Sequence, residues 1–176
     1  MKFIVTLILS AAFFIGIAQD HGFPYGQINY KDFGQLASEG DSSAIAIVLN
    51  EFGDAYLRND GSFNLIFEHH YMLKILKQSG VEEANIAIPL LKSDKRFERL
   101  LSVKASSYNI ANNRIERSDF DSKDVFNENT VKYVDYKKFT IPNVRVGSII
   151  EVIYTIESPF LSEIFEPGNF NPIYQR

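Results

Sequence analysis

The side chains most able to do chemistry in this sequence are its three histidines, because imidazole is both a metal ligand and an acid–base group near neutral pH. His69 and His70 are adjacent, whereas His21 lies far from them in the sequence. Adjacent residues of a β-strand point to opposite faces, so His69 and His70 cannot bind one metal ion together. A zinc site would need one histidine with carboxylates from distant segments. We expect His69 to be a partly buried core residue, and His70 to be solvated or paired with a carboxylate.

Acidic side chains are the second group with possible chemistry, because carboxylates bind calcium. Three aspartates lie close together in the segment SDFDSKD: Asp119, Asp121 and Asp124. An EF-hand loop that began at Asp119 would need an oxygen ligand at its fifth position and a glycine at its sixth. Lys123 and Asp124 occupy these two positions. We therefore expect an exposed acidic loop here, with a calcium loop of another kind as the alternative.

The residues of common catalytic sites are missing. The chain contains no Cys, which removes thiol nucleophiles and thiolate metal ligands. It also lacks the G-x-S-x-G, G-x-x-x-x-G-K and G-x-G-x-x-G motifs. Glutamates are paired at Glu82 and Glu83 and at Glu163 and Glu166, but nothing places two of them across one cleft, as a glycosidase requires. We therefore predict no catalytic residue, no cofactor and no metal, with a small hydrolase that uses His69 as an alternative.

The charge balance is slightly acidic, with 18 Lys and Arg against 22 Asp and Glu and a formal net charge of −4. We do not expect nucleic-acid binding, because phosphates require a basic surface. The segment 92–99 (KSDKRFER) could bind an anion, but Asp94 and Glu98 dilute its charge, which favours an exposed connection between strands. Aromatic residues near the C-terminus could form a surface for a carbohydrate or a partner, or pack on a following part of a longer chain: Phe160, Phe165, Phe170 and Tyr174.

The N-terminal segment 1–18 (MKFIVTLILSAAFFIGIA) has the features of a secretory signal peptide. Lys2 gives it a positive start, an uncharged apolar run follows, and Gly16 and Ala18 are small residues of the kind that precede a cleavage site. The apolar run is short for a membrane span, which takes about 20 residues. We predict cleavage after about Ala18 and export to the periplasm or out of the cell, with no stable membrane span afterwards. An uncleaved N-terminal anchor is the alternative.

Alternation of apolar and polar residues predicts that the rest of the chain is rich in β-strands. The clearest examples are residues 63–75 and 150–156, where apolar side chains recur at every second position. We predict an all-β fold, either an antiparallel β-sandwich or a twisted two-sheet domain, preceded by the signal peptide. The expected divisions are 1–18 for the signal peptide, 19–43 for an irregular N-terminal arm and 44–176 for the β domain.

The strand pattern has three less regular stretches. Residues 44–49 and 52–58 have the character of two separate strands. The apolar positions change parity between Ala105 and Tyr108, which predicts a β-bulge at Ser106-Ser107. The polar residues of 119–130 predict a loop.

Four stretches of the sequence carry a family resemblance. They are AIAIVLNEFGDAYL at 44–57, FEHHYMLKIL at 67–76, SGVEEANIAIPL at 79–90 and FTIPNVRVGSIIEVIYTIESPF at 139–160. Together they resemble the bacterial family called domain of unknown function 3857, over about residues 33–176. The part PNVRVGSIIEVIYTI is the most specific piece of this resemblance.

The resemblance implies an N-terminal β domain of an exported or periplasmic protein, which a transglutaminase-like domain commonly follows. That domain has a papain-like fold with a Cys–His–Asp triad, and since this chain has no Cys, the nucleophile would lie outside it. The chain stops at NPIYQR, where the family's sheet would continue, so we expect a β domain that is truncated at its C-terminus. The family assigns no catalytic residue to this domain.

We therefore expect a non-catalytic β-sandwich module that presents substrate, peptide or cell-wall material, or otherwise serves as an interaction domain. Its partner would be the downstream catalytic domain of the same longer chain. An independent module that binds a glycan, a peptide or a protein is the first alternative. The hydrolase that uses His69 is the second.

Overall fold

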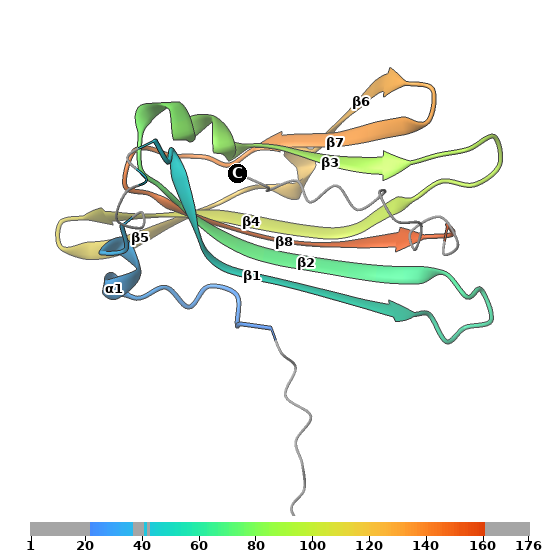
Figure 1. The fold of residues 1–176 in the computed structure, drawn as a ribbon, viewed down its shortest axis with the longest axis horizontal. Coiled ribbons are helices and arrows are strands. Elements are labelled where there is room, and N and C mark those ends of the chain that lie inside the picture. The colour runs from blue at the N-terminus through green and yellow to red at the C-terminus, as the bar shows by residue number, and fades with distance from the viewer. Residues whose placement is uncertain (1–21, 37–40, 42, 161–176) are drawn as a thin grey trace, which may run out of the picture.

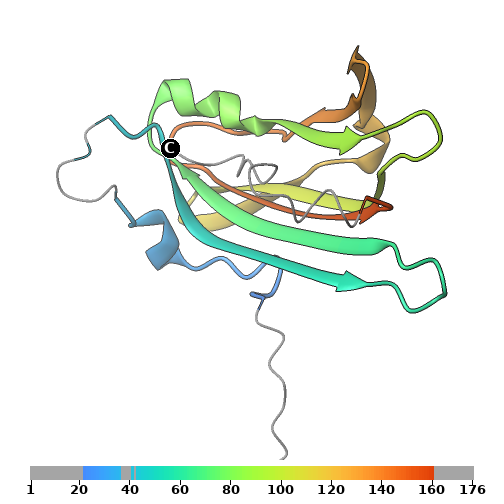
Figure 2. The same cartoon turned by 45° about the vertical axis from the view of Figure 1, so that its right-hand side comes forward.

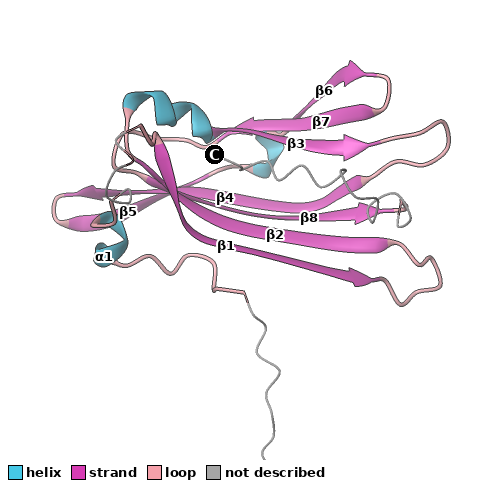
Figure 3. Ribbon diagram, viewed as in Figure 1, coloured by secondary structure: helices cyan, strands magenta, loops and turns pink. Residues whose placement is uncertain are grey.

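The structure is a computed structural model that describes residues 22–36, 41 and 43–160, and these residues form two antiparallel β-sheets (Figure 1). Sheet A has five strands in the spatial order β1 (Ala46–Leu57), β2 (Leu65–Ile75), β8 (Ile149–Ser158), β4 (Arg99–Ala111) and β5 (Arg114–Asp119). Sheet B has three, in the order β3 (Asn85–Leu91), β7 (Val134–Thr140) and β6 (Phe126–Val131). Three short helical segments are also described: α1 (Tyr30–Phe33), η1 (Gln78–Ala84) and η2 (Ser122–Asp124) (Figure 3). The predicted all-β, antiparallel two-sheet fold is confirmed.

The main core lies between the two sheets and follows from the alternation of apolar residues. Ile150 and Val152 of β8 are fully buried on the face that looks toward sheet B. Ile86 and Ile88 of β3 and Phe139 of β7 belong to the same buried cluster from the other sheet. Removing each such side chain from water contributes about 1.5–3 kcal/mol, so this core is the main source of stability.

A second, smaller core lies on the other face of sheet A. Residues 22–36, which we call the strap, cross this face and contain α1 (Figure 2). Three strap side chains, Phe23, Ile28 and Phe33, pack against one buried cluster of sheet A. The cluster consists of Met72 of β2, Tyr108 of β4 and Ile149 of β8. Sheet A is therefore a middle layer in this region, with sheet B on one side and the strap on the other.

Two predictions about strand continuity are wrong. Residues 44–49 and 52–58 do not form separate strands, because a bulge between Val48 and Asn50 absorbs one residue and lets β1 continue. The predicted loop 119–130 contains η2 and the strand β6, which pairs with β7 despite its polar sequence.

The predicted bulge at Ser106-Ser107 is also wrong. Pairing of β4 with both neighbours is continuous there, and the register shift in β4 lies between Leu100 and Ser102 instead. The apolar parity changes because Ala105 faces sheet B, whereas Tyr108 faces the strap. A change of parity thus marks a strand that is buried on both faces.

Several expectations concern residues outside those that the structure describes. They are the signal peptide at 1–18, His21, Glu163, Glu166 and the aromatic residues Phe165, Phe170 and Tyr174. Within the described ranges, no helix has the length and apolar character needed to cross a bilayer.

Candidate functional site

A buried carboxylate lies at the centre of sheet A, on the face beneath the strap. Glu151 of β8 is 0% exposed and accepts hydrogen bonds from three directions. His70 Nε2 on β2 lies 2.9 Å from Oε1, and Tyr108 Oη on β4 lies 2.7 Å from Oε2. The backbone N–H of Gly26 in the strap points at both carboxylate oxygens, at 3.2 and 3.0 Å. These groups meet because β2 and β4 are the two neighbours of β8.

The bonding pattern fixes which atoms carry protons around Glu151. Burying a carboxylate costs several kcal/mol unless hydrogen bonds offset the loss of water. An ionised carboxylate only accepts, so Nε2 of His70 carries the proton of this contact. Burial raises the pKa of Tyr108 well above its usual value, and donation to Glu151 and the nearby charge raise it further, so the phenol remains a donor. All three donors hold the carboxylate in place rather than activating it.

Aromatic residues of the strap complete this site. The ring of Phe23 stacks on the imidazole of His70 with 3.7 Å between centroids. The hydroxyl of Tyr25 lies 2.6 Å from Ser106 Oγ. Because the Ser106 hydroxyl donates its proton to Asp119 Oδ1, Tyr25 is the donor and Ser106 the acceptor in the first contact. The hydrogen bond from Ser106 is the main cause of a lowered pKa at Asp119. We call the strand residues that receive the strap the cradle: His70, Ser106, Tyr108 and Glu151.

Lys74 of β2 fixes the other half of the strap. Its side chain is 6% exposed, and Nζ donates to the carbonyl oxygens of Phe33 and Gln35. The last carbonyls of a helix lack partners within the helix, so the ammonium satisfies acceptors at the end of α1. Burial lowers the pKa of Lys74.

A second buried carboxylate, Glu157, lies further along the same face of β8 and is 2% exposed. Arg58 Nη1 donates to Oε1 at 2.5 Å, and Arg99 donates through Nε and Nη2 to Oε2 at 3.0 and 2.5 Å. Asn64 Nδ2 donates to Oε1 at 3.0 Å. The pKa of Glu157 is lowered, and the hydrogen bond from Asn64 is the largest cause. The two arginines also lower this pKa, whereas burial raises it. This carboxylate is also fully engaged within the fold.

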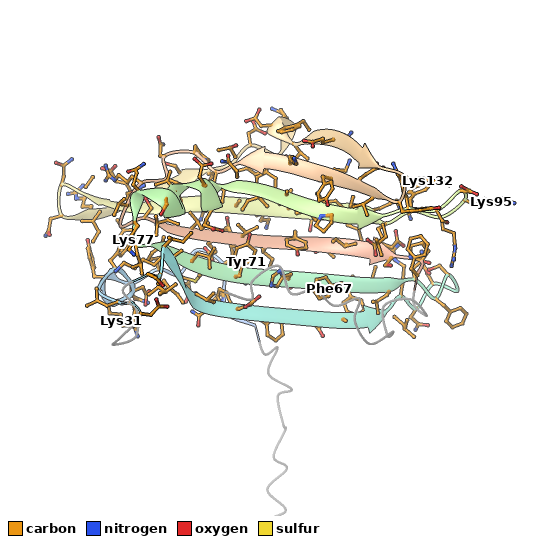
Figure 4. The ribbon with its side chains drawn as sticks, turned by 45° about the horizontal axis from the view of Figure 1, so that its top comes forward. Lys31, Phe67, Tyr71, Lys77, Lys95 and Lys132 are labelled. Atoms are coloured by element: carbon orange, nitrogen blue, oxygen red, sulfur yellow. The ribbon has the colours of Figure 1, made fainter. Side chains whose placement is uncertain are left out.

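His69 points the opposite way from His70, into the side of sheet A that faces sheet B. Its side chain is 13% exposed, with Nε2 2.9 Å from Glu51 Oε1 and Nδ1 3.1 Å from Tyr154 Oη. The rings of Phe67 and Tyr71, on the same strand, lie beside it (Figure 4). The structure confirms the expectation that His69 is partly buried and that His70 pairs with a carboxylate on the other face.

The strands that form the cradle also carry the family match. The family model described as Domain of Unknown Function DUF3857 matches residues 62–175, which is more than half of the chain. The chain belongs to this family. No curated protein matches the DUF3857 chain.

Among solved structures, the DUF3857 chain is similar to a protein from Parabacteroides distasonis that is described as a "putative protease". The two share 9% sequence identity with a TM-score of 0.48. The match covers 65% of this chain and 23% of that chain. The DUF3857 chain therefore spans less than a quarter of the length of that protein.

The other acidic and basic residues singled out in the sequence are not gathered into one site. Asp121 accepts a hydrogen bond from the backbone N–H of Lys123 at the start of η2, and Glu82 accepts one from Asn85. The segment 92–99 connects β3 to β4 and is mostly exposed. In the part of the DUF3857 chain that the structure describes, no three His, Asp or Glu side chains form a group that could hold a metal ion.

The cradle itself was not predicted from the sequence. His70 and Glu151 are 81 residues apart, and Tyr108 and Glu151 are 43 apart, so no local spacing links them. Two signals were present in the DUF3857 sequence. Glu151 stands between Ile150 and Val152 in a strongly apolar strand, and Tyr108 breaks the alternation of β4.

Proposed function

We propose that this DUF3857 chain is a non-catalytic β-sandwich module that works beside a transglutaminase-like catalytic domain and presents or holds its substrate. The observation that carries the proposal is the contrast between enclosed and exposed side chains. Glu151 and Glu157, the two carboxylates buried in sheet A, are fully bonded within the fold, so neither is open to a substrate. The three most exposed aromatic side chains among the described residues lie instead at one end of the molecule.

We call these exposed side chains the aromatic end. They are Phe63, which is 70% exposed, Phe97, which is 60% exposed, and Tyr133, which is 57% exposed. Each belongs to a different connection at the end of the molecule where β8 finishes (Figure 1). Lys95 and Lys132 lie at the same end (Figure 4). Aromatic side chains are enriched in protein–protein interfaces, so these exposed ones favour docking of a partner.

Export is part of the same proposal. The support is the sequence of residues 1–18, with its positive start, apolar run and small residues before Gln19. Intact-mass measurement of the protein from the cell envelope and the medium should give a chain that begins after about Ala18. A chain that keeps residues 1–18 would support the uncleaved anchor instead.

Two measurements test the catalytic and the docking parts separately. The purified chain should show no peptide hydrolysis, amide hydrolysis or transamidation above a blank, and clear turnover would contradict the proposal. In a titration, the chain should bind the transglutaminase-like domain encoded next to it in its genome. Phe97→Ala should weaken this binding about tenfold or more, as expected for a docking aromatic. Ile110→Ala, a change of an exposed residue at the other end of β4, should have no effect.

A hydrolase that uses His69 is the second candidate, because Glu51, His69 and Tyr154 form a line of acid–base groups. Such a line can hold an imidazole in one orientation and pass a proton through it. If the purified chain hydrolyses a test ester or peptide, His69→Ala should abolish the activity. An activity that survives His69→Ala would exclude this candidate.

A further inference from the structure

The strap is held to sheet A without strand pairing. It lies across β2, β8 and β4 without pairing with any described strand, and none of its described residues is fully buried. Its attachments are a small number of separate contacts with side chains of the sheet. A segment that is held by separate contacts, without strand pairing, can leave and return without disturbing the strands beneath it.

The cradle binds one group that any peptide carries, a main-chain N–H. Glu151 accepts a main-chain N–H, that of Gly26, rather than a side chain of the strap. His70 and Tyr108, which belong to the strands and not to the strap, supply the other two donors. Under an occupant that excludes water, the carboxylate would be poorly satisfied without a third donor, so the cradle favours an occupant with a free amide at this point.

The spacing of the contacts gives the cradle a sequence preference. Phe23 stacks on His70, and Tyr25 donates to Ser106 two residues later. At the next residue, Gly26, φ is +87°, and a Cβ would lie 3.0 Å from Arg117 Nη1, so glycine is strongly favoured. The preferred pattern is therefore Phe-x-Tyr-Gly with a turn at its Tyr-Gly step.

The docking surface continues beyond the strap. A groove of about 550 Å³ runs beside Tyr25 and is lined further along by Arg117, Asp119 and Phe120. The guanidinium of Arg117 lies 5.2 Å from the centroid of the Tyr25 ring and 5.9 Å from that of Tyr108, so this groove residue adjoins both the strap and the cradle. A longer peptide that replaced the strap would have additional polar surface to contact.

We propose that the face of sheet A beneath the strap is a docking site for a segment of another polypeptide that has the pattern Phe-x-Tyr-Gly and turns at its Tyr-Gly step. The strap occupies this site in the free chain and is displaced when the other polypeptide binds. This goes beyond the proposed function, because it concerns the cradle rather than the aromatic end and does not depend on a transglutaminase-like partner. A tethered occupant acts at an effective concentration in the millimolar range, so a partner must bind tightly or release the strap to compete.

A labelled peptide that copies residues 22–36 tests the site on the full chain. Gly26→Ala should release the strap, because alanine is strained at this φ and meets Arg117. This variant should bind the peptide at least tenfold more tightly than the wild-type chain. Gly61→Ala is the matched control, because Gly61 also has a positive φ, +83°, but lies in the β1–β2 turn with open space around it. It should bind the peptide as the wild-type chain does.

Specificity is tested by peptides that carry Phe23→Ala or Gly26→Ala, each of which should bind at least tenfold more weakly. If Gly26→Ala does not fold, hydrogen exchange on the wild-type chain tests the proposal instead. An excess of peptide should then speed up exchange in residues 22–36 while β2 and β8 remain protected. Equal binding of the altered peptides, no binding by the released variant, or unchanged strap exchange under excess peptide would overturn the proposal.

Discussion

Replacing Glu151 by glutamine tests whether one buried carboxylate fastens the strap to sheet A. The substitution Glu151→Gln keeps the shape of the side chain but removes its charge and one acceptor oxygen. At present this carboxylate accepts from Gly26 N, His70 Nε2 and Tyr108 Oη. A carboxamide offers one oxygen, and its NH2 group would face a donor. At least one of the three contacts must therefore fail.

The size of the effect follows from these three contacts. A hydrogen bond to a charged group contributes about 1.5–3 kcal/mol and a neutral one about 0.5–1.5 kcal/mol, so the two retained contacts lose about 1 kcal/mol each. A buried donor without a partner costs about 1–3 kcal/mol more. We expect Glu151→Gln to lower the free energy of unfolding by about 3–5 kcal/mol in total. That is a large part of the total stability of a domain, which is about 5–15 kcal/mol.

Urea unfolding followed by circular dichroism measures this loss, and hydrogen exchange locates it. Exchange should increase first in residues 22–36, because the strap loses its main-chain anchor. Glu116→Gln is the matched control, since Glu116 is exposed on β5 and its change should be within about 0.5 kcal/mol. A loss below about 1 kcal/mol for Glu151→Gln, or exchange in the strap equal to that of the control, would refute the reasoning.

Three further substitutions have outcomes that follow from single features. Gly80→Ala should lower the free energy of unfolding in urea by about 1–3 kcal/mol, because its Cβ would lie 2.3 Å from the backbone oxygen of Ile45. Gly53→Ala, whose Cβ has only ordinary contacts, should not destabilise, and equal losses would contradict the close approach at Gly80. Since the pKa of Glu157 in the folded chain lies below its ordinary 4.5, its stabilisation is present above that pH and is lost as the pH falls through the folded-state pKa. The unfolding temperature should therefore fall more steeply on acidification in the wild-type chain than in Glu157→Gln, and parallel curves would count against this ion cluster. Phe139→Ala should cost about 3–5 kcal/mol in chemical denaturation, and a loss near zero would mean that the core can close around the cavity.

The fold class was accessible from the sequence because one-faced burial leaves a period of two. β8 is the clearest case, with Ile150, Val152, Tyr154 and Ile156 all on the side of the main core. The β4–β5 turn is another local case, since Asn112 and Asn113 both adopt the positive φ that this hairpin requires. Local chemistry of this kind can be read without knowing which strands are neighbours.

The cradle was not accessible because it depends on strand order. Glu151 gains His70 and Tyr108 only when β8 lies between β2 and β4, and alternation says nothing about that order. The strap has no regular period, so its role as a cover could not be inferred. The parity change before Tyr108 was one of two traces of a second buried face, and it resembles a bulge when only one core is expected.

The position of β8 has a consequence for the order in which the domain folds during synthesis. The last described strand lies in the middle of sheet A, and its pairing of Ser158 with Leu65 closes a loop that spans most of the domain. Chains leave the ribosome N-terminus first, so the β1–β2 and β4–β5 hairpins must wait as separate, marginal pieces until β8 arrives. The strap is synthesised before either hairpin, yet it docks last, because β8 carries the carboxylate that receives it. Assembly of this domain therefore runs against the order of its synthesis, and a chain halted before Ile149 should have neither sheet A nor a place for its own N-terminal segment.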